Sequence, residues 1–260
     1  MSDQPRQSVI VDIHEYYRVG GIDWPRAADN FDAIGIRCCV GMEHDDLFFY
    51  HVEKAVLHDM IYFTYAVPQA FYPPDEQVDF YLETDGVADH AVVGDIEESD
   101  GDMVSEYQAR KFFERLIARQ TNPWYYSNYY YTSKLGFPQW IQPLVKWWAE
   151  YPYDILTKYR KWERYLIKNP WKIPKWAVKA GYTPEFHQLT DYGDARHYLA
   201  NAATDDPKWR QGIKSCDLTV SLIDDDESMS LLIPGQAMPS LEQRVEALEQ
   251  QVAVLEGFHN

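Results

Sequence analysis

The sequence has few basic residues and no long apolar run, and each shortage excludes a class of protein. Its 260 residues include 24 Lys and Arg against 41 Asp and Glu, a formal net charge of −17. Nucleic-acid-binding proteins need a basic surface to neutralise phosphates, so we expect no nucleic-acid partner. No segment approaches the ~20 apolar residues of a membrane-spanning helix, so we also expect no stable membrane insertion.

The amino-terminal residues carry no export signal. Residues 1–7 are polar and lack the basic and then apolar pattern of a signal peptide. We therefore expect a soluble product made in the cytoplasm without a signal peptide. If the protein acts outside the cell, something else must release it.

Cysteine and histidine supply neither a disulfide framework nor a metal site. Three cysteines are too few for such a framework, and adjacent Cys38 and Cys39 point to opposite faces of a strand, which favours buried, reduced thiols. The third is Cys216. The histidines at positions 14, 44 and 187 lack a metal-binding spacing, so we expect no metal and no cofactor.

The chain is rich enough in apolar residues to build a large core, at 46% hydrophobic and 15% aromatic content. Short apolar runs typical of strands recur at the spacing of βα units. Eight strands with early helices between them favour a closed α/β barrel, which places catalysis at the carboxyl ends of its strands. The expected strands are Val9–Asp12, Ile34–Val40, Met60–Val67, Ala91–Glu97, Pro123–Ser127, Val145–Glu150, Glu185–Leu189 and Asp217–Ile223. The expected helices are Trp24–Phe31, Phe48–His58, Asp75–Thr84 and Met103–Arg119.

Acidic residues stand at the ends of predicted strands. Asp95 and Glu97 have the i, i+2 spacing that puts both on one face of a strand, roughly 6.5–7 Å apart along the backbone. Asp12 ends the first strand and so reaches the same rim of a barrel. Glycosidic-bond hydrolysis needs two carboxylates, one to protonate the leaving oxygen and one to handle the oxocarbenium-like centre. The structural alternative makes Asp12 a helix cap, Asp217 a turn former and the central pair solvated loop acids.

A segment rich in Tyr, Trp and Lys lies at about 154–181. Between Thr121 and Gly181 there are ten basic residues against three acidic ones, a local excess of +7 in an acidic protein. One interpretation is a flap that faces a cell wall, a glycan or a membrane, with Trp162, Trp171 and Trp176 as stacking platforms. The other is a helical insertion whose aromatic side chains pack on the barrel.

The carboxyl-terminal residues predict a linker and a helix. Residues 224–239 contain an acidic run and a Pro-Gly pair, typical of a linker. Residues 240–260 follow, with a capping box at Ser240 and Gln243 and apolar residues at heptad spacing. This coiled-coil helix either joins a homo-oligomer through residues 240–256 or docks on its own barrel. The heptad residues are Leu241, Val245, Leu248, Val252 and Leu255.

Five segments, in order along the chain, resemble the family 25 glycoside hydrolases, which are cell-wall muramidases. Val9–Trp24 is similar to their first strand, which ends in Asp and is followed by an aromatic residue and Ile-Asp-Trp. Asp95–Glu97 matches the central Asp-x-Glu of the family. Ile36–Gly41 lies where the family has a second strand with a basic residue. Trp148–Tyr151 matches its Trp-x-Ala-x-Tyr strand, and Cys216–Leu218 matches its final Val-Asp-Leu. The resemblance covers about residues 8–223.

The resemblance implies an irregular eight-stranded TIM-like β/α barrel with about five helices. It further implies cleavage of the β-1,4 bond between N-acetylmuramic acid and N-acetylglucosamine in peptidoglycan, as in cell-wall lysis by bacteriophage endolysins. By position, Glu97 is the general acid, Asp95 its partner, and Asp12 and Asp217 supporting carboxylates. Crowded carboxylates raise the pKa of at least one of them, which keeps an acid protonated near neutral pH. The implied sugar-binding residues are Tyr16, Arg37, Tyr65, Trp148, Tyr151 and Gln188.

Four positions depart from the family pattern. Ala66 stands where the family usually has His, so we expect a polar groove residue to be missing. His14 replaces Ser, His187 replaces Trp, and Thr219 replaces Asn. These changes leave two alternatives to a muramidase: a weak or inactive barrel that serves as a glycan-binding or structural part of a virion or wall assembly, and a hydrolase of another acetylated polysaccharide.

Overall fold

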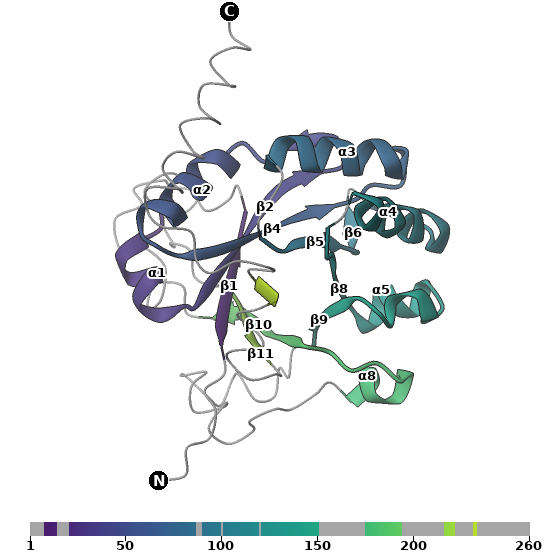
Figure 1. The fold of residues 1–260 in the computed structure, drawn as a ribbon. Coiled ribbons are helices and arrows are strands. Elements are labelled where there is room, and N and C mark those ends of the chain that lie inside the picture. The colour runs from purple at the N-terminus through teal and green to yellow at the C-terminus, as the bar shows by residue number, and fades with distance from the viewer. Residues whose placement is uncertain are drawn as a thin grey trace, which may run out of the picture.

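The computed structural model describes residues 8–14, 21–86, 90–99, 101–119, 121–150, 175–193, 216–221 and 231–232 (Figure 1). All eight predicted strands are present in it, with ends that differ by a few residues. They are β1 (Val9–Ile13), β2 (Ala33–Val40), β4 (Ile61–Val67), β5 (Val92–Asp95), β8 (Trp124–Asn128), β9 (Val145–Ala149), β10 (Phe186–Gly193) and β11 (Cys216–Ser221). Three short strands were not predicted: β3 (Glu43–His44), β6 (Glu98–Ser99) and β7 (Asp102–Met103).

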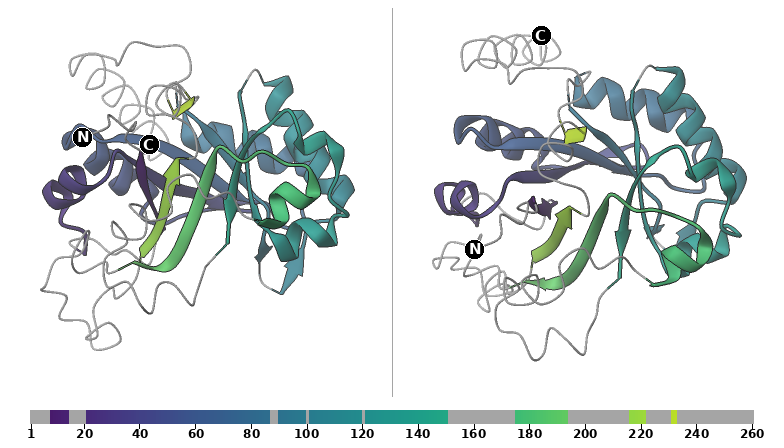
Figure 2. Two further views of the ribbon diagram at one scale, coloured as in Figure 1. Left: turned by 90° about the horizontal axis from the view of Figure 1, so that it is seen from below. Right: turned by 60° about the horizontal axis from the view of Figure 1, so that its bottom comes forward.

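The strands form one curled, mostly parallel sheet. From β1 through β2, β4, β5, β8 and β9 to β10 every neighbouring pair is parallel. β11 is antiparallel to both of its partners, β10 and β1, so that β1 pairs with the strands on either side of it. The sheet therefore curls back on its first strand, and the barrel-like α/β fold predicted from the sequence is confirmed (Figure 2).

Alternation along the strands separates two apolar cores. One core consists of strand residues that face the inside of the curled sheet, together with Leu232. There Phe63 lies 5.4 Å from Trp124 and 5.4 Å from Trp147 between ring centroids, and Trp124 stacks on Phe186 at 4.4 Å. The second core joins the other face of the strands to the helices. Strand residues thus alternate between an inner aromatic core and an outer helical one.

Six α-helices of the described residues cover the outside of the sheet (Figures 1 and 2). The four predicted helices are present, and α5 is too short for its periodicity to show in the sequence. The fourth helix begins later than predicted, because Ser105 and Gln108 form a capping box and Met103 belongs to β7. The helices are α1 (Trp24–Asn30), α2 (Phe48–Leu57), α3 (Pro74–Asp85), α4 (Glu106–Ala118), α5 (Tyr129–Lys134) and α8 (Lys175–Ala180), with a 3₁₀ turn η1 (Gln139–Ile141).

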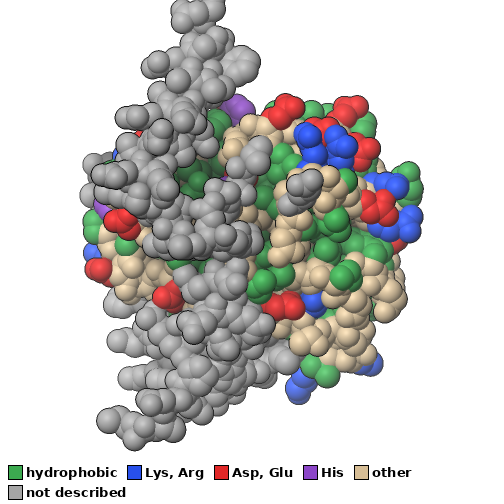
Figure 3. All heavy atoms as spheres, viewed as in Figure 1, with side chains coloured by type: hydrophobic (Ala, Val, Ile, Leu, Met, Phe, Trp, Pro, Cys, Tyr) green, Lys and Arg blue, Asp and Glu red, His purple; other side chains and the backbone are tan. Residues whose placement is uncertain are grey.

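The surface over α3 and α4 carries mixed charge. Acidic and basic side chains alternate there, at the upper right of Figure 3. Arg115 and Arg119 both reach Asp79, at 2.6 and 3.0 Å. Such exposed ion pairs contribute little to stability, typically about 0.2–1 kcal/mol each. The apolar contact between the helices and the sheet is close at Gly94, where a Cβ would lie 2.5 Å from Cζ of Phe113 in α4 and would force that ring to shift.

The structure bears on the predicted aromatic segment at 154–181 at one residue. Trp162 and Trp171 lie outside the described residues, but the ring of Trp176 packs 4.8 Å from that of Trp148. This contact supports packing of Trp176 on the barrel rather than a role as a stacking platform for a ligand.

The predicted linker contains a residue of the core. Leu232 has no exposed surface and its carbonyl accepts a hydrogen bond from the amide of Ala91 at 3.2 Å. The barrel therefore includes residues beyond 223, and the coiled-coil helix at 240–260 lies outside the described part. Within that part, no helix is long and apolar enough to cross a membrane.

Replacing Leu232 with Ala should lower the free energy of unfolding by about 2–5 kcal/mol, because it removes a fully buried side chain from the inner core. Urea unfolding followed by circular dichroism measures this. Leu57→Ala is the control, since Leu57 is 63% exposed and its loss should cost little. Equal unfolding midpoints for the two variants would show that Leu232 is dispensable to the barrel.

Candidate active site

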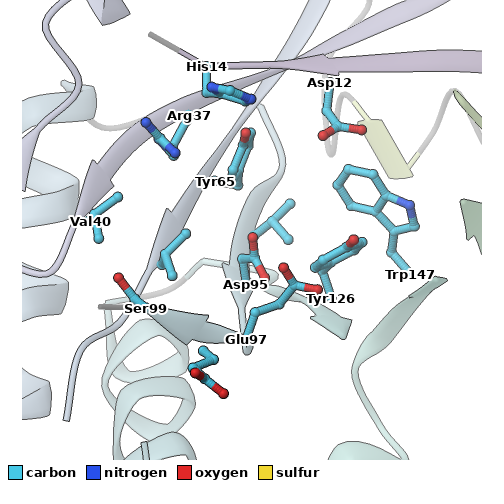
Figure 4. A pocket seen from close by; sticks show the side chains of 13 residues that line it. Asp12, His14, Arg37, Val40, Tyr65, Asp95, Glu97, Ser99, Tyr126 and Trp147 are labelled. Carbon is cyan, nitrogen blue, oxygen red and sulfur yellow. The ribbon is translucent and has the colours of Figure 1, made fainter. Parts of the chain in front are cut away.

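A cavity of about 310 Å³ opens where the parallel strands end. Its walls come from β1, β2, β4, β5, β8 and β9 and from the residues that follow β5 (Figure 4). Because all of these strands run in the same direction, their carboxyl ends meet at one rim. Asp12 and Asp95, at strand ends, and Glu97, two residues after β5, all line this cavity. The structure thus brings together the three acids that the sequence placed at strand ends.

Glu97 has the electrostatics of an acid that is protonated near neutral pH. Burial, followed by the charge of Asp12, raises its pKa from 4.5 to about 7. Asn128, the last residue of β8, opposes this by donating from Nδ2 to Oε1 of Glu97 at 3.4 Å. The same asparagine accepts a bond from the amide of Tyr131 and so caps α5. The start of a helix therefore holds the residue that orients Glu97.

The side chain of Gln188, on β10, hydrogen-bonds to Asp12. The amide Nε2 of Gln188 donates to Oδ1 of Asp12 at 3.2 Å, and its Oε1 accepts from the hydroxyl of Tyr126 at 2.7 Å. Gln188 is 1% exposed, whereas Tyr126 lines the cavity. The predicted sugar-binding role of Gln188 does not fit this burial, because the side chain lies behind the cavity wall and contacts two residues that form it.

Arg37 and His14 also line the cavity and lie near each other in Figure 4, across from Asp95 and Glu97. Arg37 donates from Nε to Oδ2 of buried Asp45 at 3.1 Å, so its position is set by an ion pair behind the wall. Burial, then the charges of Arg37 and His51, lowers the pKa of His14 to about 3. His14 is therefore a neutral imidazole, with one donor and one acceptor, at every pH near neutrality. Beneath them, Tyr65 lines the cavity and donates its hydroxyl to the carbonyl of Ile13 at 3.1 Å.

Solved structures share this architecture. A bacterial lysozyme from Streptomyces coelicolor matches with a TM-score of 0.63 and 15% identity, over 90% of this chain and 100% of that one. A family 25 lysozyme from Aspergillus fumigatus matches with a TM-score of 0.62 and 14% identity, over 87% and 99%. The catalytic domain of an endolysin from a bacteriophage of Listeria monocytogenes matches with a TM-score of 0.62 and 12% identity, over 89% and 98%.

The chain has the fold of the family 25 lysozymes. Identities of 12–15% make this a likeness of fold. No family model and no curated protein sequence matches the chain.

For two of the expected differences from the family 25 pattern, at Ala66 and Thr219, the structure shows where the replaced side chain lies and what it contacts. Ala66 faces the helices in the outer core, so the predicted loss of a polar groove residue at this position is wrong: Tyr65 and Val67 are the residues of β4 that line the cavity. Thr219, which replaces Asn, accepts a bond from Nε1 of Trp147 at 2.9 Å. A threonine hydroxyl thus supplies the acceptor that anchors an indole of the cavity wall.

The structure does not place Trp148, predicted to bind sugar, at the cavity. Its side chain has no exposed surface and packs in the outer core against Tyr125, Trp176 and Tyr182. Trp147 lines the cavity instead, because successive residues of a strand point to opposite faces. The signal was present in the sequence, since Val145, Trp147 and Ala149 share one face of β9 and belong to the inner core.

The remaining predicted residues are placed only in part. Asp217 stands opposite Asp12 in the β1–β11 ladder, and its side chain lies outside the described part of the structure. Tyr16 and Tyr151 also lie outside it. Besides Trp147 and three valines, sequence reasoning missed four cavity residues that carry polar groups, namely His14 as a lining side chain, Tyr126, Glu98 and Ser99. Among the described residues, no cluster of His, Cys, Asp and Glu is arranged to hold a metal ion.

Replacing Glu97 with Gln should stabilise the protein at pH 8. Because the folded-state pKa of Glu97 is raised, its contribution to stability is fully present below about pH 4.5 and is lost as the pH rises through about 7. Removing the charge should therefore raise the free energy of unfolding at pH 8 by up to ~3 kcal/mol and change it little at pH 4. Urea unfolding at both pH values measures the difference.

The neighbouring substitution Glu98→Gln is the control. Glu98 is exposed, so the same change in charge there should leave stability nearly the same at both pH values. A Glu97→Gln variant that is no more stable than Glu98→Gln at pH 8 would contradict the burial of a carboxylate with a raised pKa.

Proposed function

We propose that this protein is a glycoside hydrolase that cleaves the β-1,4 bond between N-acetylmuramic acid and N-acetylglucosamine in peptidoglycan. The observation that carries the proposal is Glu97, an acid with a pKa of about 7 at the rim of a cavity that is also lined by Asp12 and Asp95. An acid of this pKa is protonated in a useful fraction of molecules at neutral pH and still gives up its proton readily. In the structural alternative these residues are solvated loop acids, and neither a shared cavity nor a raised pKa is then expected.

The arrangement accounts for each chemical step of glycoside cleavage. Glu97 donates its proton to the glycosidic oxygen while the bond from that oxygen to the anomeric carbon breaks. The carboxylates of Asp12 and Asp95 face the positive charge that develops on the sugar ring. Asn128 keeps Glu97 oriented through the 3.4 Å bond to Oε1. A water molecule completes the hydrolysis: its hydroxyl bonds to the anomeric carbon, and its other proton restores the acid form of Glu97.

The walls of the cavity suit a polar sugar with acetamido groups. Trp147 and Tyr65 offer flat apolar surface, and Arg37 and His14 offer hydrogen-bond donors. We propose these four as the sugar-contacting residues, and we retain Asp217, Tyr16 and Tyr151 as proposals from the family 25 pattern. The finer description of the fold, an irregular eight-stranded TIM-like barrel, belongs to the same proposal and is supported by the pairing of β1 with both β2 and β11.

The structural neighbours support peptidoglycan as the substrate class. One is described as a muramidase from Trichobolus zukalii, and another, the bacteriophage protein, as the catalytic domain of an endolysin. We propose an endolysin-like enzyme that acts on the bacterial cell wall.

Replacing Glu97 with Gln should reduce the release of reducing ends from purified cell walls by at least ~10²-fold, since the amide has no proton to donate. In the unaltered protein, kcat/KM should fall as the pH rises above about 7, because Glu97 loses its proton there. Glu53→Gln, in α2 and exposed, is the control: it makes the same change of charge away from the cavity and should retain activity. Wild-type release that is no greater than that of Glu97→Gln would reject the enzymatic proposal, and mass spectrometry of the products identifies the bond cleaved.

We also propose that residues 240–256 join copies of the chain as a coiled coil. Deleting Ser240–Asn260 should lower the mass measured by light scattering and leave turnover per chain intact. A full-length protein that is already monomeric would contradict this proposal without affecting the hydrolase proposal.

A further inference from the structure

Gln188 connects three strands that are not all neighbours. It lies on β10, and its amide reaches Tyr126 of β8 on one side and Asp12 of β1 on the other. In the order of the sheet, β9 separates β10 from β8, and β11 separates β10 from β1. The side chain therefore bridges the interior of the curled sheet just below the cavity, where it is 1% exposed.

The two contacts determine which way the amide points. The hydroxyl of Tyr126 donates to Oε1 at 2.7 Å, so this end of the amide acts as acceptor. The other end, Nε2, can only donate, and it faces Oδ1 of Asp12 at 3.2 Å. A carboxylate accepts hydrogen bonds when it is ionised, so an N–H aimed at it favours the charged form and fixes its direction.

We propose that Gln188 is a positioning residue, which with Tyr126 holds the Asp12 carboxylate ionised and directed at Glu97 and thereby sets the pH range over which the acid works. This inference rests on the proposed function and replaces the sugar contact expected for Gln188. The link from Asp12 to Glu97 is electrostatic, because the charge of Asp12 is the second cause, after burial, of the raised pKa of Glu97. Without the amide, Asp12 is less ionised and less well directed, so the pKa of Glu97 should fall.

Other charged and titratable groups also surround Glu97. Asp95 comes from β5 and Glu98 from β6, and both line the cavity together with Tyr126 of β8. On the far wall, Arg37 of β2 is paired with Asp45 and His14 is neutral. From outside the wall, Tyr131 of α5 lies within electrostatic range of Glu97.

The test compares Gln188→Met with Gln77→Met. Methionine has a similar length to glutamine but lacks the amide N–H that donates to Asp12. Gln77 is also buried, at 2% exposed, and its amide bonds to the backbone of Gln69 and Tyr72 on α3's side of the fold, so its variant reports the general cost of losing a buried glutamine. The high-pH limb of kcat/KM on cell walls should move about 0.5–1 unit toward lower pH in Gln188→Met and should stay in place in Gln77→Met, because a neighbouring carboxylate typically shifts a pKa by about 1 unit or more.

The split between kcat and KM separates positioning from sugar binding. At pH 5, below the limb, a positioning role predicts a KM within about twofold of wild type. A raised KM at every pH with an unmoved limb would overturn the inference and assign Gln188 to the substrate. Tyr126→Phe is the second variant, for use if Gln188→Met does not fold: it removes the hydroxyl that donates to the amide and should move the limb in the same direction by a smaller amount. An unmoved limb there would also overturn the inference.

A second readout does not need enzymatic activity. The stabilisation that Glu97→Gln produces at pH 8 reports the pKa of Glu97 through linkage. This stabilisation should be smaller in the Gln188→Met background than in the wild-type background. If the protein hydrolyses no glycan and the stabilisation still shrinks, the positioning role stands while the proposed function fails. If hydrolysis is observed and neither the limb nor the stabilisation changes, only the positioning role fails.

Discussion

The pairing of β1 with two partners is the constraint on which the rest of the structure depends. This five-residue strand, buried throughout, is parallel to β2 on one side and antiparallel to β11 on the other. Its register places Asp12 between Gly35 and Asp217. Gly35 leaves the necessary space, since a Cβ there would lie 3.1 Å from Cβ of Asp12 and 2.7 Å from Cζ of Phe63. Through these two pairings, the first strand brings a carboxylate to the rim where β5 delivers two more.

Gathering carboxylates at one rim has an energetic cost, and the surrounding structure offsets it in specific ways. Hydrogen bonds reach Asp12 from Gln188 and Glu97 from Asn128. Burial of Glu97, and after it the remaining repulsion from Asp12, raises the pKa of Glu97, which makes the site less stable at high pH. Below the acids, stacked aromatic rings such as Trp124 and Phe186 fill the barrel and keep its geometry rigid. A site of this kind trades stability for reactivity.

The departures from the family 25 pattern preserve the chemical character of the cavity more than their identities suggest. His14 introduces a larger side chain, but one that its surroundings keep neutral. Thr219 retains a hydrogen-bond acceptor for Trp147, and Ala66 does not face the cavity. The cavity therefore keeps its acids together with the polar groups of Arg37 and His14.

Much of this protein was determined by local sequence. The order and type of the eight long strands and four longer helices follow from hydrophobic periodicity, because alternation and 3.6-residue spacing are properties of neighbouring residues. The positions of Asp12, Asp95 and Glu97 at strand ends follow from the same patterns. The alternation along β9 also indicates which of its residues face the inside of the sheet. Matching a family motif nevertheless favoured Trp148 over Trp147, which is one residue away and on the opposite face.

Other features were decided only by the tertiary structure. Gln188 and Asp12 are 176 residues apart in the chain and become hydrogen-bonded only when β10, β11 and β1 curl together. The pKa of Glu97 depends on burial and on the charge of Asp12, neither of which a local segment contains. Leu232 likewise joins the inner core from a segment with the composition of a linker. The sequence alone thus determines which acids stand at the rim, and closure of the sheet determines their protonation and their partners, because electrostatic energies depend on distances in space rather than along the chain.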